Sequence, residues 1–132
     1  KMSNKLDKIL AEISAGELFD KITILEIKKE KISNNEKLVD VEKELNSLND
    51  AVEKFIPNQN NISKHINDLK GINLKLWDIE DGKRAAEKEK KFDDKFIELA
   101  RNVYKFNDER AKIKLEINIT LGSNIKEVKS YK

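Results

Sequence analysis

The stretch from Lys37 to Phe55, KLVDVEKELNSLNDAVEKF, carries the pattern that decides the fold. Its apolar side chains follow one another at intervals of 3, 4, 3, 4 and 3 residues, and most positions between them are charged or carry an amide. The members of this series are Leu38, Val41, Leu45, Leu48, Val52 and Phe55. Such spacing places one apolar seam on a helix whose other faces are solvated. We therefore predict a helix over residues 36–55 that packs against other helices.

The composition extends this prediction to the whole chain. Hydrophobic residues make up 38% of the 132 residues and charged residues 39%, which suits helices with one apolar stripe each. One Pro and four Gly leave little to interrupt long helices. The length fits a single domain, 1–132. We predict an all-α, antiparallel bundle of about four helices with a long C-terminal helical hairpin, the helices spanning about 15–32, 36–55, 61–90 and 93–121.

Capping signals set these bounds. Ser14-Ala-Gly-Glu17 and Ser33-Asn-Asn-Glu36 both read as capping boxes, and Asp93 or Asp94 is a suitable N-cap for the last helix. Gly122 stands where a glycine would close that helix. Residues 1–13 form either a short helix or an extended lead-in, and residues 123–132 form a polar tail.

Charge and residue content exclude several classes of function. The net charge is +2, with both signs interspersed, which is no footprint for nucleic acid. Cysteine is absent, and the single histidine, His65, leaves neither a metal site nor a catalytic triad. No apolar run approaches the length of a bilayer span, and no signal-peptide core precedes Ser14. We expect a cytoplasmic protein with no metal, cofactor, nucleic-acid partner or membrane partner.

The helix predicted at 15–32 is apolar on two sides. Leu18, Ile22 and Leu25 share one face, whereas Ile24 and Ile27 fall nearly opposite at 100° per residue. A helix of this kind is either central in its bundle or packed against a second subunit. The sequence thus raises the expectation of a homodimer through residues 15–32.

The apolar stripes of the last two predicted helices turn polar partway along. In helix 61–90, the azimuth of Ile62, Ile66 and Leu69 continues through polar and aromatic positions, and helix 93–121 does the same after Val103. Two antiparallel helices that turn near Phe92 bring Trp77 level with Asn107 and Glu80 level with Tyr104. The candidate ligand-binding residues are therefore Asn73, Trp77, Glu80, Arg84, Tyr104, Asn107 and Arg110.

This polar stripe has three interpretations. It is a buried network in which Glu80 pairs with Arg110 or Arg84 and Asn73 fixes the helix register. Alternatively, it lines a pocket in which Arg and Asn side chains bind an anionic or polar ligand and Trp77 stacks on it. In the third interpretation the stripe faces solvent. The pattern favours the network.

Several motifs resemble a known family. They are GELFDKITILEIKKEKI at 16–32, NLKLWDIEDGKR at 73–84, FIELARNVYKFNDERAKIKLEIN at 96–118, and the ending GSNIKEVKSY. Together they resemble a family of uncharacterised bacterial proteins, catalogued as a domain of unknown function, over most of the chain outside 33–70. The segment LDKILAEI before Ser14 departs from the shorter, more β-like lead that the family implies.

The resemblance implies further candidate residues and a biological context. It implies that the recurring polar positions of the family include the candidates above and, as secondary candidates, Glu17, Asp20, Lys21 and Arg101, together with Glu26. It also implies a role near bacterial surface-glycan assembly, which is an association and no activity.

Three functions follow from these interpretations. The favoured one is a small non-catalytic helical protein that binds a polar or anionic small molecule or a protein partner, with no catalytic residue assigned. An alternative is an all-α enzyme similar to chorismate mutase, in which Arg84, Arg110, Lys21 or Lys28, and Glu80 act electrostatically. The third is a purely structural coiled-coil protein.

Overall fold

The computed structural model describes residues 5–129 and consists of helices joined by short turns. The helices are α1 (Ala15–Lys31), α2 (Asn35–Phe55), a 3₁₀ turn η1 (Asn60–Ile62), α3 (Ser63–Glu89) and α4 (Asp94–Leu121). The all-α prediction is confirmed, and each predicted bound lies within two residues of the observed one. Residues 1–4 and 130–132 of the predicted lead-in and tail lie outside the described residues.

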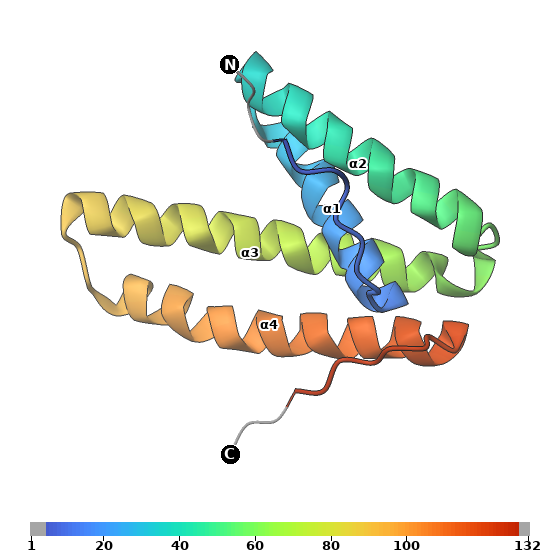
Figure 1. The fold of residues 1–132 in the computed structure, drawn as a ribbon. Helices are drawn as coiled ribbons and strands as arrows, with labels where there is room; N and C mark the ends of the chain where they lie inside the picture. Colours follow the sequence, from blue (N-terminus) through green and yellow to red (C-terminus); the bar gives the residue numbers. More distant parts are fainter. Residues whose placement is uncertain (1–4, 130–132) are drawn as a thin grey trace.

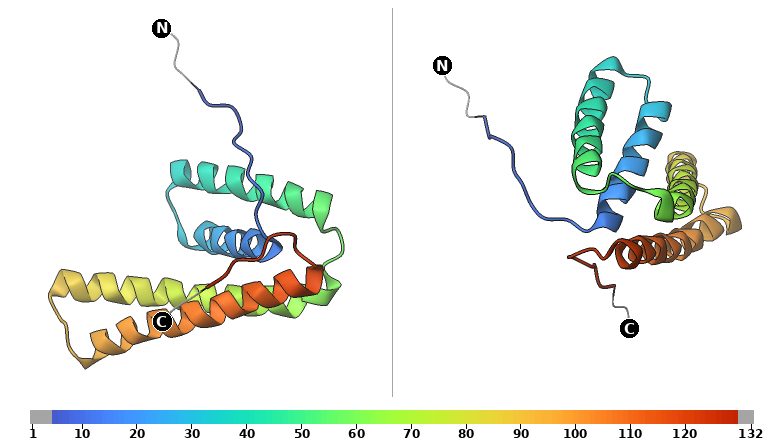
Figure 2. Two further views of the ribbon diagram at one scale, coloured as in Figure 1. Left: turned by 60° about the horizontal axis from the view of Figure 1, so that its bottom comes forward. Right: turned by 90° about the vertical axis from the view of Figure 1, so that its right-hand side faces the viewer.

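Two antiparallel hairpins build the molecule (Figure 1). The α3–α4 hairpin is long and makes the most extensive contact of any helix pair, and α1 and α2 lie across one end of it. α1 contacts α2, α3 and α4, whereas α2 packs on α1 alone. The end-on view in Figure 2 places α1 between α2 and the long hairpin. α1 is therefore the central helix.

The central position of α1 explains its two apolar faces. Leu18, Ile22 and Leu25 belong to the main core, and Ile27 is 1% exposed. The exposed positions of this helix are the charged residues Lys21, Lys29, Glu30 and Lys31. Contacts within one chain thus explain the two apolar faces that suggested a homodimer. The homodimer itself stays a prediction.

The helix termini follow local capping chemistry. Ser14 Oγ accepts from Glu17 N at 3.1 Å, as predicted, but the Glu17 carboxylate bonds to Lys114 instead of closing the box. α2 is capped by Asn34, which accepts from Lys37 N at 3.0 Å, and not by Ser33. The capping-box prediction at Ser33 was wrong by one residue because an amide oxygen caps as well as a hydroxyl.

Local capping also sets the start of α4 and the ends of α3 and α4. Asp93 Oδ1 accepts from Phe96 N at 3.2 Å, as predicted for α4. α3 ends at Lys90 and α4 at Gly122, both in the left-handed region with φ of 56° and 64°. Gly122 meets the expectation that a glycine closes this helix, because it adopts that conformation without steric cost.

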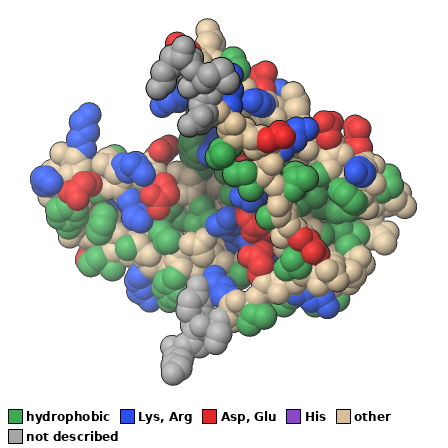
Figure 3. Space-filling view, in the orientation of Figure 1, with side chains coloured by type: hydrophobic (Ala, Val, Ile, Leu, Met, Phe, Trp, Pro, Cys, Tyr) green, Lys and Arg blue, Asp and Glu red, His purple; other side chains and the backbone are tan. Residues whose placement is uncertain are grey.

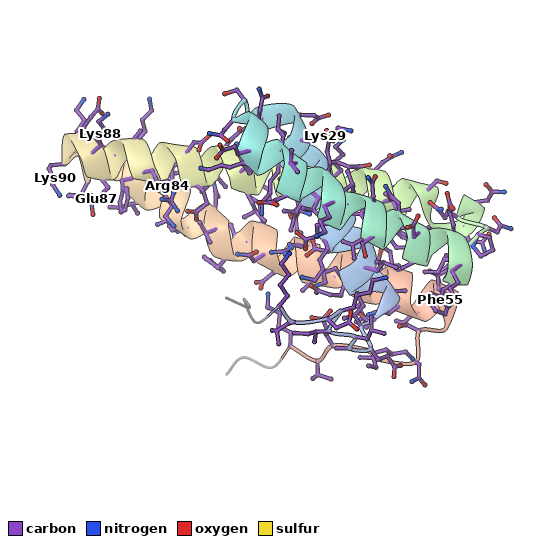
Figure 4. All side chains as sticks on the ribbon, turned by 45° about the horizontal axis from the view of Figure 1, so that its top comes forward. Lys29, Phe55, Arg84, Glu87, Lys88 and Lys90 are labelled. Atoms are coloured by element: carbon purple, nitrogen blue, oxygen red, sulfur yellow. The ribbon has the colours of Figure 1, made fainter. Side chains whose placement is uncertain are left out.

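The core lies where the two hairpins overlap. It joins side chains of α1, α2, η1, α3 and α4, and Ile62, Leu69 and Ile117 are fully buried in it. Of the predicted seam of α2, Val41, Leu45 and Val52 are buried, but Phe55 is 71% exposed. Phe55 lies at the far end of α2, where the seam no longer faces the core (Figure 4).

Beyond the overlap, the hairpin projects as a two-helix arm. No residue from 80 to 104 is buried, and Phe92 and Ile97 are more than half exposed. We call residues 80–104 the free arm, and the region where α1 crosses α3 and α4 the packed end. Figure 3 shows apolar side chains lying between charged ones along the arm.

The ends of the described chain lack regular secondary structure. Residues 5–13 form the extended alternative of the two that the sequence allowed, and Leu6, Ile9 and Leu10 are at least 80% exposed. After Gly122 the chain turns back along α4 (Figures 1 and 2), and Lys129 Nζ reaches Asp108 Oδ1 at 3.3 Å. None of the helices among residues 5–129 combines the length and the apolar character that crossing a membrane requires.

Candidate functional site

A buried ion pair links α1 to α4 at the packed end. The carboxylate of Asp20 is 1% exposed and accepts two hydrogen bonds from Arg110. Arg110 Nε lies 2.8 Å from Oδ1, and Nη2 lies 2.5 Å from Oδ2. This fork geometry is the strongest form of a carboxylate–guanidinium contact. Because the carboxylate is buried, removing this partner would leave a polar group without compensation in the interior.

Asn73 ties α3 into the same ion pair. Its Nδ2 donates to Asp20 Oδ1 at 3.0 Å and to Thr23 Oγ1 at 2.9 Å. The hydroxyl of Thr23 in turn donates to the carbonyl of Asp20 at 2.8 Å. Both protons of the Asn73 amide are therefore used, and three helices meet at one carboxylate.

Lys114 forms a second cationic centre one turn further along α4. Its Nζ lies 2.7 Å from Glu17 Oε2, 3.3 Å from Glu127 Oε1 and 4.0 Å from Asp20 Oδ2. The side chain is 14% exposed. Two cations of α4 are thus shared among three carboxylates, two from α1 and one from the C-terminal segment.

This charge arrangement keeps both cations protonated. The hydrogen bond to Asp20 raises the pKa of Arg110, and this outweighs the opposite effect of burial. For Lys114, burial lowers the pKa, but the hydrogen bond to Glu17 and the charges of Asp20, Glu17 and Glu127 raise it further, so the net shift is upward. Groups that hold their protons this firmly are poorly suited to general acid–base chemistry near neutral pH.

The first backbone amides of α1 donate to side chains of α4 and of the segment that follows it. Ala15 N donates to Ser123 Oγ at 3.1 Å, and Gly16 N donates to Asn118 Oδ1 at 2.6 Å. Ser14 Oγ, 2% exposed, donates to Glu127 Oε1 at 3.2 Å. A Cβ on Gly16 would lie 2.4 Å from the carbonyl oxygen of Lys114, so only glycine permits this approach of α1 to α4.

The structure divides the predicted candidates among different environments. Asn73 and Asn107 join the Asp20–Arg110 network, where Arg110 Nη1 donates to Asn107 Oδ1 at 3.3 Å. Trp77 is half-buried and Tyr104 is 56% exposed. Glu80 and Arg84 line a recess of about 220 Å³ on the free arm, and Arg110 is not part of its lining. Figure 4 shows Arg84 on the part of α3 that extends beyond α1 and α2.

Two predicted pairings of Glu80 were wrong. Glu80 Oε1 pairs with Lys83 Nζ at 3.2 Å on its own helix, and Arg110 pairs with Asp20. The reason is that α1 crosses the hairpin at Arg110 and supplies a closer carboxylate. The cationic set of the mutase-like alternative is divided accordingly, since Arg84 and Arg110 lie in different recesses.

The secondary candidates lie closer to the network. Asp20 is its centre, and Glu17 bridges Lys114 and Lys21, the latter at 3.7 Å. Arg101 lies apart, in a shallow recess on the outer face of α4. Sequence reasoning missed Lys114, Thr23, Ser14, Asn118 and Glu127 as participants. Lys114 follows Arg110 on the polar stripe, which is the one signal that could have identified it.

A groove opens beside this network. It has a volume of about 890 Å³ and lies between α4 and the returning C-terminal segment. Five basic side chains line it, against the two acidic ones Asp108 and Glu127. The basic ones are Arg110, Lys112, Lys114, Lys126 and Lys129. Figure 3 shows basic and acidic side chains gathered near the middle of the face that the C-terminal segment crosses.

Within the described residues, every buried side-chain nitrogen or oxygen has a hydrogen-bond partner. The interior of the packed end is thus a satisfied polar network. Arg110 keeps unused donors on its solvent side. Its guanidinium carries five N–H donors, and three of them bond to Asp20 and Asn107. The side chain is 29% exposed and lines the groove.

Comparison with known proteins gives a family and no activity. A search of curated proteins and a search of solved structures found no significant match. The model of a family of unknown function, DUF6165, matches residues 9–132. This match includes all four helices, the network around Asp20 and the groove. The chain therefore belongs to the family of unknown function DUF6165.

Proposed function

We propose that this protein is a non-catalytic binding module that takes a small anionic ligand in the groove between α4 and the C-terminal segment. The observation that carries the proposal is that five basic side chains line the groove and that two of them, Lys112 and Lys126, have no carboxylate partner within the described residues. The volume of about 890 Å³ lies in the range of small-molecule sites. Arg110 is held rigidly by Asp20 and keeps donors toward the groove, which is the arrangement that recognises a carboxylate or phosphate.

The chemistry of the site favours binding over catalysis. The cations are held in their protonated forms by neighbouring carboxylates, and the buried groups satisfy one another. We further propose, from the sequence resemblance, that the ligand belongs to a bacterial surface-glycan context and that the protein is cytoplasmic. Fractionation of the native host would test the compartment.

The test of ligand binding uses variants that leave the network intact. Lys112 and Lys126 line the groove, and neither forms an ion pair within the described residues. The double variant K112Q/K126Q therefore lowers the positive charge of the groove without touching Asp20. The matched control is K37Q/K43Q, which removes the same charge from exposed positions of α2.

Calorimetric titration with sodium succinate and with inorganic phosphate at low ionic strength measures binding. We expect the wild-type protein and K37Q/K43Q to bind alike, and K112Q/K126Q to bind about fivefold or more weakly, since each lost surface charge contact is worth on the order of 1 kcal/mol. Equal weakening in both double variants, or no binding of either anion by the wild-type protein, would overturn the proposal.

A further inference from the structure

One carboxylate of the chain itself already occupies the cationic groove. Glu127 lies on the C-terminal segment, outside any helix, and is 52% exposed. Its Oε1 accepts from Ser14 Oγ at 3.2 Å and lies 3.3 Å from Lys114 Nζ, and its Oε2 lies 3.4 Å from the same nitrogen. A carboxylate on a segment without regular secondary structure thus contacts one hydroxyl donor and one ammonium group at the helical part of the molecule.

Apart from the hydroxyl donor of Ser14, the network keeps its partners without Glu127. Without it, Lys114 keeps Glu17 at 2.7 Å and Asp20 at 4.0 Å, and Ser14 still caps α1 by accepting from Glu17 N. What Glu127 alone provides is an acceptor for the buried hydroxyl of Ser14 and a third carboxylate at Lys114. Any other carboxylate that reached this position would provide the same contacts.

A second anionic group would find Arg110 within reach. Asp20 Oδ2 lies 2.5 Å from Arg110 Nη2 and 4.0 Å from Lys114 Nζ, so the two cations are neighbours across one oxygen. With Glu127 and the segment that carries it displaced, Arg110, Lys112 and Lys114 of α4 remain against one acidic side chain, Asp108. This balance suits a ligand with two negative charges a few bonds apart.

Resting on the proposed function, we propose that the ligand is a small dicarboxylate and that one of its carboxylates replaces Glu127 between Ser14 and Lys114. Glu127 is then a built-in competitor, and the segment that carries it is a strap that leaves the groove when ligand enters. A tethered group competes at an effective concentration in the millimolar range, so it weakens the apparent affinity for free ligand without preventing binding. The apparent dissociation constant rises as the fraction of open groove falls.

The test compares two single charge removals in the same region of the molecule. E127Q removes the competing carboxylate. E109Q is the matched control, because Glu109 is exposed on α4 beside the groove residue Arg110 and forms no ion pair within the described residues. Both variants remove one negative charge near the groove, and only E127Q removes a contact of the strap, so they separate displacement from long-range attraction.

Succinate is the probe, titrated into the full-length wild-type protein and both variants. If the strap is closed for about nine-tenths of the time, E127Q binds succinate about tenfold more tightly than the wild-type protein, and E109Q changes the affinity by no more than about twofold. In the wild-type protein, succinate lowers the heteronuclear NOE of the amides of residues 125–129, because the strap is released.

Two outcomes overturn this inference and leave the proposed function standing. One is an equal gain in E127Q and E109Q, which assigns the effect to net charge alone. The other is binding of phosphate but not of succinate by the wild-type protein, which removes the dicarboxylate. Failure of both anions to bind to any of the three proteins overturns the proposed function itself.

Discussion

The packed end and the free arm are built from the same two helices and carry the same kind of polar stripe, yet the stripe does different things in each. In the packed end, Asn73 is 5% exposed and both its amide protons are bonded. Two and four turns further along the same stripe, Glu80 and Glu87 are exposed and pair only with Lys83 and Lys90 on their own helix. The difference is whether α1 covers the stripe.

This comparison explains what a polar stripe on a helix indicates. Where another helix crosses, each polar group must be matched by a partner of the crossing helix, because an unpaired buried group is costly. Where nothing crosses, the same residue types are solvated and contribute little. Both regions carry polar residues at the same azimuth of α3, and the position of α1 separates a network from a surface.

The largest expected effect tests the network against the arm. Arg110→Met leaves the carboxylate of Asp20 buried without its main partner, and removal of one member of a buried pair typically costs about 3–5 kcal/mol of unfolding free energy. Arg84→Met makes the same change on the exposed arm, where we expect no more than about 0.5 kcal/mol. Urea denaturation followed by circular dichroism measures both.

A second variant keeps this prediction informative if R110M fails to fold. D20N/R110M replaces the carboxylate as well, so no charge is left buried, and we expect it to be more stable than R110M alone. Equal losses for Arg110→Met and Arg84→Met would contradict the distinction between the packed end and the free arm.

The fold was predictable from sequence because helical periodicity and capping are local properties. The seam from Leu38 to Val52 and the caps at Ser14, Asp93 and Gly122 each depend on residues within one or two turns. The partner of Arg110 was not predictable in this way. Asp20 lies 90 residues away, and its contact depends on the angle at which α1 crosses the hairpin. Glu80 was predicted to lie level with Tyr104 on the hairpin and to belong to a buried network. No other helix covers Glu80, so it pairs with Lys83 on its own helix.

The second effect concerns how closely α1 approaches α4. Gly16→Ala places a Cβ 2.4 Å from the carbonyl oxygen of Lys114 and 3.0 Å from Asn118 Oδ1. A backbone atom cannot move aside easily, so we expect a loss of about 1–3 kcal/mol, as for other overpacked sites.

Gly71→Ala is the matched control for this contact. Gly71 lies inside α3, and a Cβ there meets nothing within 4 Å. The better helix propensity of Ala should then stabilise the protein by about 0.5–1 kcal/mol. The two glycines should therefore give thermal melting shifts of opposite sign, and a shift of the same sign in both would argue against the close approach of α1 to α4.

The smallest effect is a pH dependence that belongs to Lys114. Its pKa is raised above the ordinary value of 10.5 in the folded protein, so protonated Lys114 favours folding. This contribution is fully present below pH 10.5, the ordinary value that the unfolded chain retains, and it is lost as the pH rises through the higher folded value. The stability difference between the wild-type protein and K114Q should accordingly stay constant at lower pH and shrink above that point.

Urea denaturation of both proteins from neutral to strongly alkaline pH measures this difference directly. K88Q serves as the control, because Lys88 is exposed on the free arm and its variant should track the wild-type protein throughout (Figure 4). Subtracting the curve of K114Q from that of the wild-type protein removes the contributions that the two proteins share and leaves that of Lys114. A stability difference that grows with pH would contradict this prediction. It would mean that burial, which lowers the pKa of Lys114, outweighs the three carboxylates that raise it. Protonated Lys114 would then destabilise the folded protein.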